Sequence, residues 1–402
     1  MTKTLASADW LTASDTQTVM AALEAARPDG ARFVGGCVRN SLMGRPIDDI
    51  DIATQLKPQE TLAALAAAGI RAIPTGIEHG TVTAIVDGTP FEITSLRRDV
   101  ETDGRRAVVA FTQDWAEDAM RRDFRLNAIY ADAAGKLYDP TGHGIEDAAK
   151  ARVVFIGDAD QRLREDYLRI LRFFRFNAWY GGEIDAEGLA ACKRQKDGLE
   201  KIAAERIWKE FKKMLGAPDP ESALEAMEAS GVFHQILPQR SGIAELHDLK
   251  VAEMLTRQAP DPMQRLMALL GGATDIENVI EAMKMSNVEA ARLQLFASAE
   301  VPANFASSGK VLRRNLYLFG AQALIDRSML SAKDARDVVA ACLSWARPIF
   351  PLKGEDLLKS GMSPGPEMGK WLKTLENWWI EGDFQADKPA LLEELERQLK
   401  AD

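Results

Sequence analysis

Two glycines and two aspartates near the N-terminus have the types and spacing needed to bind a metal–nucleotide complex. Gly35 and Gly36 lie in the segment FVGGCVRN (33–40), and Asp49 and Asp51 follow it. Glycines leave backbone N–H groups uncovered, so phosphate oxygens can approach them closely. Residues i and i+2 of a strand share a face, which would point both carboxylates the same way. A turn followed by a charged edge strand is the alternative for this pattern taken alone.

Hard carboxylate oxygens beside a phosphate cradle suit Mg²⁺ bound to a nucleoside triphosphate. We therefore expect Asp49 and Asp51 to be catalytic ligands of two Mg²⁺ ions. In such a site one ion activates the attacking hydroxyl and the other neutralises the triphosphate as pyrophosphate leaves. Glu92, in the segment FEIT (91–94), lies on another predicted strand and is a candidate third catalytic carboxylate. A half-exposed strand residue is the alternative for Glu92.

A second cluster is the segment RRDFRLNA (121–128). Arg122 could pair with phosphate, while Asp123 and Asn127 could bond a ribose hydroxyl as acceptor and donor. On a helix these last two residues are i and i+4 and share a face. An ordinary ion-paired helix end would have the same composition, so this cluster alone leaves both interpretations open.

The third cluster is the segment REDYLRILR (164–172), in which Asp166 and Arg169 are i and i+3 on a predicted helix. Cytosine and adenine each present an amino donor beside a ring acceptor, whereas uracil and guanine present a carbonyl beside a ring N–H. An Asp/Arg pair therefore matches C and A and leaves polar groups mismatched against U and G. A surface salt bridge of the helix is the alternative for this pair.

The elements that must position these residues form an α+β domain with a small mixed sheet. Hydrophobic patterning, turn residues and helix-stopping glycines predict the elements, and Asp87-Gly88 predicts a hairpin turn. The predicted strands cover 32–35, 50–53, 81–86 and 90–95, and the predicted helices cover 15–26, 38–43 and 58–68. The polar segment 97–114 is typical of a mobile loop near the site or of a surface excursion. From about residue 158 onward the pattern is helical almost throughout.

The length, cysteine content and net charge of the chain limit the number of domains, the cellular compartment and the way in which RNA could be bound. The chain has 402 residues, which favours two to four folding units. Its three cysteines are widely spaced, and we find neither a signal peptide nor an apolar run that could span a bilayer, so we expect a cytoplasmic protein without a membrane partner. A net charge of −10 argues against non-specific coating of nucleic acid but allows RNA binding through a local basic face.

Taken in this order, the clusters resemble the bacterial and eukaryotic class (class II) of tRNA nucleotidyltransferases, the CCA-adding enzymes, and their poly(A) polymerase relatives. The matching motifs span nearly the whole chain. They are GGCVRNSLMGR (35–45) with Asp49 and Asp51, RRDF (121–124) with Asn127, ED (165–166) with Arg169, Arg172 and Arg175, ERIWKE (205–210), GEDL (354–357) and PGPEMG (364–369). Several ordered motifs at the right spacing are far more specific than any single one.

The resemblance implies a catalytic nucleotidyltransferase head (1–150), a helical neck with the nucleotide template (151–235), and a helical, tRNA-binding body and tail (236–402). It implies that the head binds Mg²⁺, that the acceptor arm and 3′ end of tRNA are bound, and that CTP and ATP are used to build CCA without a nucleic-acid template. The residues expected to bind nucleotide are Gly35, Gly36, Arg39, Arg122, Asp123, Asn127, Asp166, Arg169, Arg172 and Arg175.

Some features depart from the family pattern and keep alternatives open. Asn40 replaces the usual aspartate, and Arg125-Leu126 replace Thr-Ile. The 97–114 segment has full length, which favours completing the final A over partial (CC-only or A-only) addition, and poly(A) synthesis ranks second. A nucleotide-sugar transferase, a non-catalytic tRNA-binding protein, and a phosphohydrolase site near His247-Asp248 are further alternatives. The sequence leaves the oligomeric state open between monomer and dimer.

Overall fold

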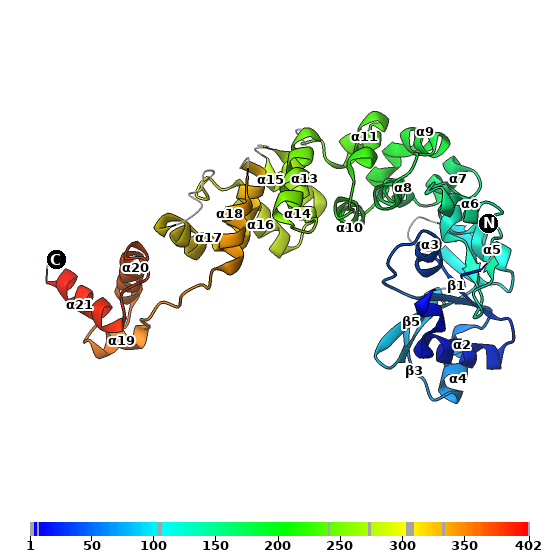
Figure 1. The fold of residues 1–402 in the computed structure, drawn as a ribbon, viewed down its shortest axis with the longest axis horizontal. Helices are drawn as coiled ribbons and strands as arrows, with labels where there is room; N and C mark the ends of the chain where they lie inside the picture. Colours follow the sequence, from blue (N-terminus) through cyan, green and yellow to red (C-terminus); the bar gives the residue numbers. More distant parts are fainter. Residues whose placement is uncertain are drawn as a thin grey trace. The chain divides into compact units, whose positions relative to one another are not determined.

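The computed structural model describes residues 4–5, 8–102, 107–239, 242–271, 275–302, 309–331 and 334–400, with backbone only for 99–102 and 107–109. The chain divides into two compact units, Met1–Pro238 and Gln239–Asp402 (Figure 1). The first unit combines a mixed sheet with helices, and the described part of the second unit is helical. This is the expected architecture of an α+β head followed by an all-helical remainder.

The main sheet of the first unit has seven strands in the order β3-β4-β5-β2-β1-β8-β9. Strands β2 and β5 pair in parallel, and the other neighbours pair antiparallel. The strands are β1 (Ala31–Val34), β2 (Asp51–Thr54), β3 (Arg71–Gly76), β4 (Thr81–Val86), β5 (Thr89–Ser95), β8 (Tyr130–Ala131) and β9 (Leu137–Tyr138). The predicted strands in the first third of the chain are confirmed to within two residues.

The two faces of β4 and β5 have opposite character, as alternation along a strand requires. Val82, Ala84, Phe91 and Ile93 are buried, and the helices α2 (Ser14–Ala26) and α4 (Pro58–Ala67) pack against β4. The alternate positions, which carry threonines and Glu92, are half-buried or exposed. The sheet therefore has one face in the core and one polar face, and Glu92, one of the predicted catalytic carboxylates, lies on the polar face.

The helices of both units follow from the periodic apolar pattern. In the first unit the remaining helices are α1 (Asp9–Thr12), α3 (Gly36–Leu42), η1 (Ile77–His79), α5 (Trp115–Met120), η2 (Arg125–Asn127), α6 (Gly144–Ala149), α7 (Ala159–Glu165), α8 (Leu168–Tyr180), α9 (Ala186–Gln195), η3 (Lys196–Lys201), α10 (Ala204–Leu215), α11 (Glu221–Ser230) and α12 (Val232–Ile236). In the second unit they are α13 (Ala244–Thr256), α14 (Pro262–Leu270), α15 (Ile276–Met283), α16 (Asn287–Ala297), α17 (Lys310–Ser331), α18 (Arg336–Ser344), α19 (Gly354–Lys359), α20 (Pro366–Glu381) and α21 (Lys388–Leu399). Within the described ranges, we find no helix with the length and apolar character that a bilayer crossing needs.

Three strands of the first unit were not expected from the sequence. The segment 97–114, expected to be a mobile loop or a surface excursion, contains the antiparallel strands β6 (Arg97–Thr102) and β7 (Ala107–Phe111), and residues 103–106 lie outside the described residues. Strands β6 and β7 pair with each other in a separate two-stranded sheet. They were not predicted because the many charged residues of the segment obscured the short apolar run of β7. Strand β3 was missed because it contains Pro74, which is tolerated there because β3 is an edge strand.

Candidate active site

The turn between β1 and α3 brings the glycine pair next to Asp51. Gly35 has φ +73°, a conformation that glycine adopts without strain, and a Cβ built there would lie 3.4 Å from Asp51 Oδ2. Val34 and Asp51 are direct partners in the β1–β2 ladder. The glycine turn and the carboxylate thus meet at the same end of the sheet, as their proximity in sequence predicted.

Asp51 and Glu92 are partners in the parallel β2–β5 ladder, so their side chains start from neighbouring positions on the same face. Burial, and after it repulsion from Glu92 and Asp49, raises the pKa of Asp51 to about 6. The shared strand face expected for Asp49 and Asp51 is not formed, because β2 begins at Asp51 and Asp49 lies exposed in the segment before it. The structure therefore places Asp51 and Glu92 side by side on the polar face, with Asp49 in the segment just before β2, close enough to raise the pKa of Asp51.

This donor set fits a hard divalent cation. Carboxylate oxygens that repel one another in the free protein gain from a positive ion between them. Within the described ranges, no three acidic, histidine or cysteine side chains form a complete metal site. Mg²⁺ tolerates this arrangement well, because it binds through one or two carboxylates and completes its shell with water and substrate phosphates.

A pocket of about 370 Å³ lies beside Asp51 and contains most of the residues expected to bind nucleotide. We call it the central pocket, and it is lined by Gly35, Gly36, Arg39, Asp51, Arg121, Arg122, Asp123, Asn127, Asp166, Arg169, Arg172 and Phe176. Arg175 does not line it; its Nε donates to Glu210 Oε2 at 2.6 Å. Arg121 and Phe176 were not singled out from the sequence, although Arg121 adjoins Arg122 and Phe176 follows Arg172 by one helical turn.

Asp123 joins the head to helix α8 at the wall of the central pocket. It accepts hydrogen bonds from Arg172 Nε at 2.8 Å and from Asn127 Nδ2 at 3.0 Å. Burial by itself would raise the pKa of Asp123, but Arg172 and Asn127 together lower it to about 2. The predicted helix through 123 and 127 is wrong: a short 3₁₀ turn, η2, brings the two side chains together instead.

Arg39 links the glycine turn to the same helix. It is buried, and its guanidinium donates to Asn127 Oδ1 at 2.6 Å, to Asn40 Oδ1 and to the hydroxyl of Tyr180. Arg45 donates to the carbonyl of Trp179 at 2.8 Å, at the C-terminal end of α8, where a cation is favourable. Helix α8 is therefore attached to the head at two places. Arg172, near the middle of the helix, contacts Asp123, and the last turn of the helix contacts Arg39 and Arg45.

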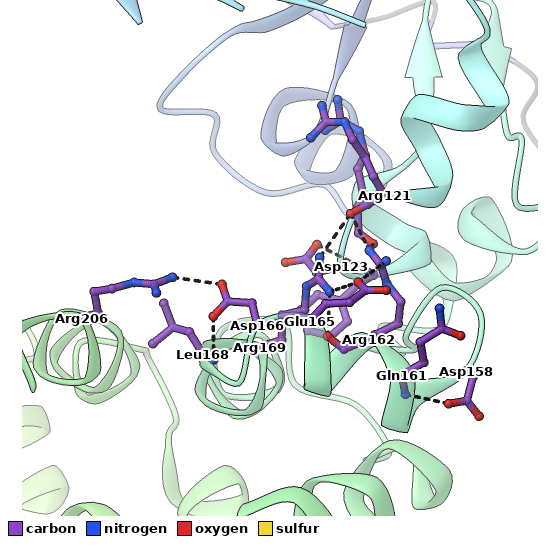
Figure 2. Close-up of polar contacts among 12 residues, drawn as sticks. Arg121, Asp123, Asp158, Gln161, Arg162, Glu165, Asp166, Leu168, Arg169 and Arg206 are labelled. Carbon is purple, nitrogen blue, oxygen red and sulfur yellow. Dashed lines mark hydrogen bonds and ion pairs between the residues drawn. The ribbon is translucent and has the colours of Figure 1, made fainter. Parts of the chain in front are cut away.

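Asp166 and Arg169 lie at the break between α7 and α8, where each is held by a different partner (Figure 2). Asp166 accepts from Arg206 Nη2 at 3.0 Å and from the backbone N–H of Leu168. Arg169 Nη1 donates to Glu165 Oε2 at 2.6 Å. Placing Asp166 on a helix was wrong, since it has extended backbone angles at the junction. In the described structure the two side chains do not pair with each other, so the surface salt bridge between them is absent.

Asp118 is the buried support of the pocket arginines. Its side chain is 1% exposed and accepts from Arg121 Nε at 2.9 Å, from Arg122 Nη2 at 3.0 Å and from the hydroxyl of Tyr130 at 2.7 Å. It also accepts from the backbone N–H of Arg97, the first residue of β6. Asp118 therefore fixes two cationic side chains at the pocket wall, and no sequence motif singled it out.

We expect Asp118→Asn to lower the free energy of unfolding by about 3 kcal/mol at pH 7, because it removes the charge that faces two largely buried arginines. Burial by itself raises the pKa of Asp118, but Arg122 and Arg121 outweigh it and lower the pKa to about 2. The stabilisation is therefore complete above about pH 4 and is lost as pH falls toward 2. Urea unfolding of both proteins across this range measures it.

The matched control for this prediction is Asp160→Asn. Asp160 pairs with Arg194, whose side chain is 54% exposed, so the change should cost less than about 1 kcal/mol. A deficit of Asp118→Asn that stays constant from pH 7 to pH 2, or that does not exceed the deficit of the control, would contradict the assignment.

Comparison with known proteins agrees with this geometry. The model of the poly A polymerase head domain matches residues 31–154, and the model described as probable RNA and SrmB-binding site of polymerase A matches residues 182–242. The chain is 35% identical over 382 residues to the mitochondrial CCA tRNA nucleotidyltransferase 1 of Danio rerio, covering 90% of this chain and 86% of that protein. It is 32% identical over 406 residues to the CCA-adding enzyme of Limosilactobacillus fermentum, covering 96% and 99%.

Solved structures share the fold over almost the whole chain. The CCA-adding enzyme of Bacillus stearothermophilus, solved in complex with CTP, matches with a TM-score of 0.75 at 24% identity, covering 97% of this chain and 100% of that one. The Thermotoga maritima CCA-adding enzyme, complexed with tRNA, matches with a TM-score of 0.64 at 17% identity, covering 95% and 94%. With the carboxylate pair and the central pocket in place, the chain belongs to the CCA-adding tRNA nucleotidyltransferases, which add CCA to the 3′ end of tRNA.

Proposed function

We propose that this chain builds the complete CCA end, C then C then A, from CTP and ATP in one active site, and releases pyrophosphate at each step. The observation that carries this proposal is the central pocket itself. Asp51, the arginines Arg121 and Arg122, and the pair Asp166 and Arg169 all line this one pocket. A triphosphate, a ribose and a base edge would each meet side chains of matching chemistry in this one pocket.

Two Mg²⁺ ions are the proposed cofactor, with Asp49 and Asp51 as ligands and Glu92 beside them. When bound, they supply positive charge to the triphosphate and make the attacking hydroxyl more acidic. The support for Asp51 is its position against Glu92 and Gly35. The protein's own part is to hold these carboxylates rigidly on the sheet, so that no reorganisation is needed during reaction.

The other side chains of the central pocket have separate roles in binding the phosphates and the ribose and in supporting the pocket wall. Arg121 and Arg122, held by Asp118, present guanidinium groups toward phosphate. Asp123 and Asn127 face the ribose, and Arg172 keeps Asp123 ionised. Arg39 supports the wall, because most of its N–H groups already donate to protein acceptors.

Base choice is assigned to Asp166 and Arg169. An amino donor beside a ring acceptor, as in C and A, satisfies both side chains, while U and G leave them facing groups of the wrong kind. Each side chain has a resting partner, Arg206 for Asp166 and Glu165 for Arg169. A matching base must replace these contacts with hydrogen bonds of equal quality, which sharpens the penalty for a base that cannot.

One assay tests the proposal. Purified protein is incubated with tRNA lacking its last three nucleotides, and products are resolved at single-nucleotide length. We expect two added nucleotides with CTP alone and three with CTP and ATP together. A product that stops at two with both triphosphates would indicate CC addition only, and a long ladder with ATP alone would indicate poly(A) synthesis. Size-exclusion chromatography decides between monomer and dimer, and a cytoplasmic location stays a prediction.

A further inference from the structure

A second hollow, of about 500 Å³, opens beside Asp51 on the polar face of the sheet. We call it the sheet-face hollow. It shares Asp51, Arg121 and Arg122 with the central pocket, and its other lining residues are Val34, Ile52, His79, Thr81, Glu92, Thr94 and Arg97. The two cavities therefore meet at the carboxylate that is the proposed metal ligand.

Transfer of a nucleotide needs the attacking hydroxyl and the leaving pyrophosphate on opposite sides of one phosphorus atom. Two adjoining cavities that share Asp51 can hold these groups, one in each. The central pocket contains the base-reading pair and Phe176, whereas the described lining of the sheet-face hollow contains neither. Its threonines, carboxylates and arginines match a ribose and a phosphate better than a base.

Thr81 and Thr94 are the most specific feature of the hollow. They are partners in the β4–β5 ladder, and their Oγ1 atoms lie 3.1 Å apart. One hydroxyl hydrogen joins the pair, so one donor hydrogen and several lone pairs remain. A group that both donates and accepts, such as a ribose 2′-hydroxyl, complements this arrangement. Both threonines lie on the face that carries Glu92, two residues from Thr94 along β5.

Arg97 forms the rim of the same hollow. Its Nη1 donates to the carbonyl of His79 at 2.8 Å, and its backbone N–H donates to Asp118. The side chain is thus held at the His79 end of the hollow and the backbone of Arg97 is held by Asp118, which places a positive charge at the rim of the cavity. This is the charge that the phosphate preceding a terminal ribose would need.

We propose that the sheet-face hollow binds the 3′-terminal nucleotide of the acceptor RNA, and that the Thr81–Thr94 pair recognises its 2′-hydroxyl. This inference rests on the proposed function and adds an acceptor subsite and a specificity: the enzyme extends ribose ends better than 2′-deoxyribose ends. The 2′-hydroxyl is the group by which a protein distinguishes RNA from DNA at a given position.

The test compares two tRNAs that lack CCA and differ only in a ribose or a 2′-deoxyribose at the 3′ terminus, both with a free 3′-hydroxyl. The quantity measured is the ratio of kcat/KM for CMP addition to the two acceptors. We expect a wild-type ratio of about five, and we expect Thr94→Val and the double variant with Thr81→Val to reduce it to about one. The KM for CTP should not change, because the central pocket does not include these threonines.

The chain offers a matched control in the neighbouring strand pair, β3 and β4. Thr75 and Thr83 form the same kind of hydroxyl pair, 2.9 Å apart, and neither lines the hollow. Thr83→Val should keep the wild-type ratio, and Thr94→Ser, which keeps the hydroxyl, should keep it too. Thermal melts and CTP binding verify that each variant is folded.

Three results would overturn the proposal: a wild-type ratio of one, an unchanged ratio in both valine variants, or an equal change in Thr83→Val. Failure of the proposed function would look different, since the wild-type enzyme would then add no CMP to the ribose-ended tRNA.

Discussion

An Asp51→Asn enzyme is expected to lose nucleotide addition by about a thousand-fold while it still binds CTP and tRNA. Charge stabilisation at a reacting phosphate contributes several kcal/mol, and each 1.4 kcal/mol is a factor of about ten in rate. Asparagine keeps the shape of the side chain and its place in the ladder with Val34 and Glu92. It removes only the negative charge that draws a cation to this position. Single-turnover CMP incorporation and titration with CTP measure the two properties separately.

A second readout distinguishes loss of a ligand from loss of structure. Mg²⁺ should raise the melting temperature of the wild-type protein and have a much smaller effect on Asp51→Asn, because a ligand that binds only the folded state stabilises it. Asp48→Asn, an exposed neighbour three residues earlier, is the matched control and should behave like wild type in both assays. Near-normal turnover of Asp51→Asn would show that the metal assignment is wrong.

Arg169→Ala should decrease CMP and AMP incorporation about a hundred-fold and remove most of the preference for CTP over UTP. A two-point match to a base edge contributes about 1–3 kcal/mol of discrimination, and alanine removes its donor half. The change also removes one of the two arginine donors to Glu165. In the variant, Glu165 would keep the hydrogen bond from Arg162 Nη1, which is 2.5 Å long in the wild-type structure. Misincorporation of UMP under CTP–UTP competition is the quantity to measure, because a purely structural defect would slow both nucleotides equally.

Arg164→Ala is the control for Arg169→Ala. Arg164 is exposed on α7, five residues before Arg169, and does not line the central pocket. It should leave the ratio of CMP to UMP incorporation unchanged. If Arg169→Ala also leaves that ratio unchanged, Asp166 and Arg169 do not read the base, even if overall activity falls.

Local spacing in the sequence determined much of this protein. The glycine pair followed by Asp51, the β4–β5 hairpin with its Asp87-Gly88 turn, and the helical remainder could all be read directly, because they depend on neighbours within a few residues. The chemistry expected of Asp123 with Asn127 also depended on proximity, and the two side chains do meet. The predicted secondary structure between them was wrong, since a 3₁₀ turn and not an α-helix connects the two residues.

Only the tertiary structure decided which distant residues meet. Glu92 faces Asp51 because β2 and β5 pair in parallel in one particular register, and a shift of one residue would turn Glu92 to the other face. Arg172 reaches Asp123 across 49 residues, and Arg206 reaches Asp166 across 40. Residue spacing fixes which side chains share a face of one element. The register between strands and the docking of α8 on the head depend on packing of the whole unit, and no short segment contains that information.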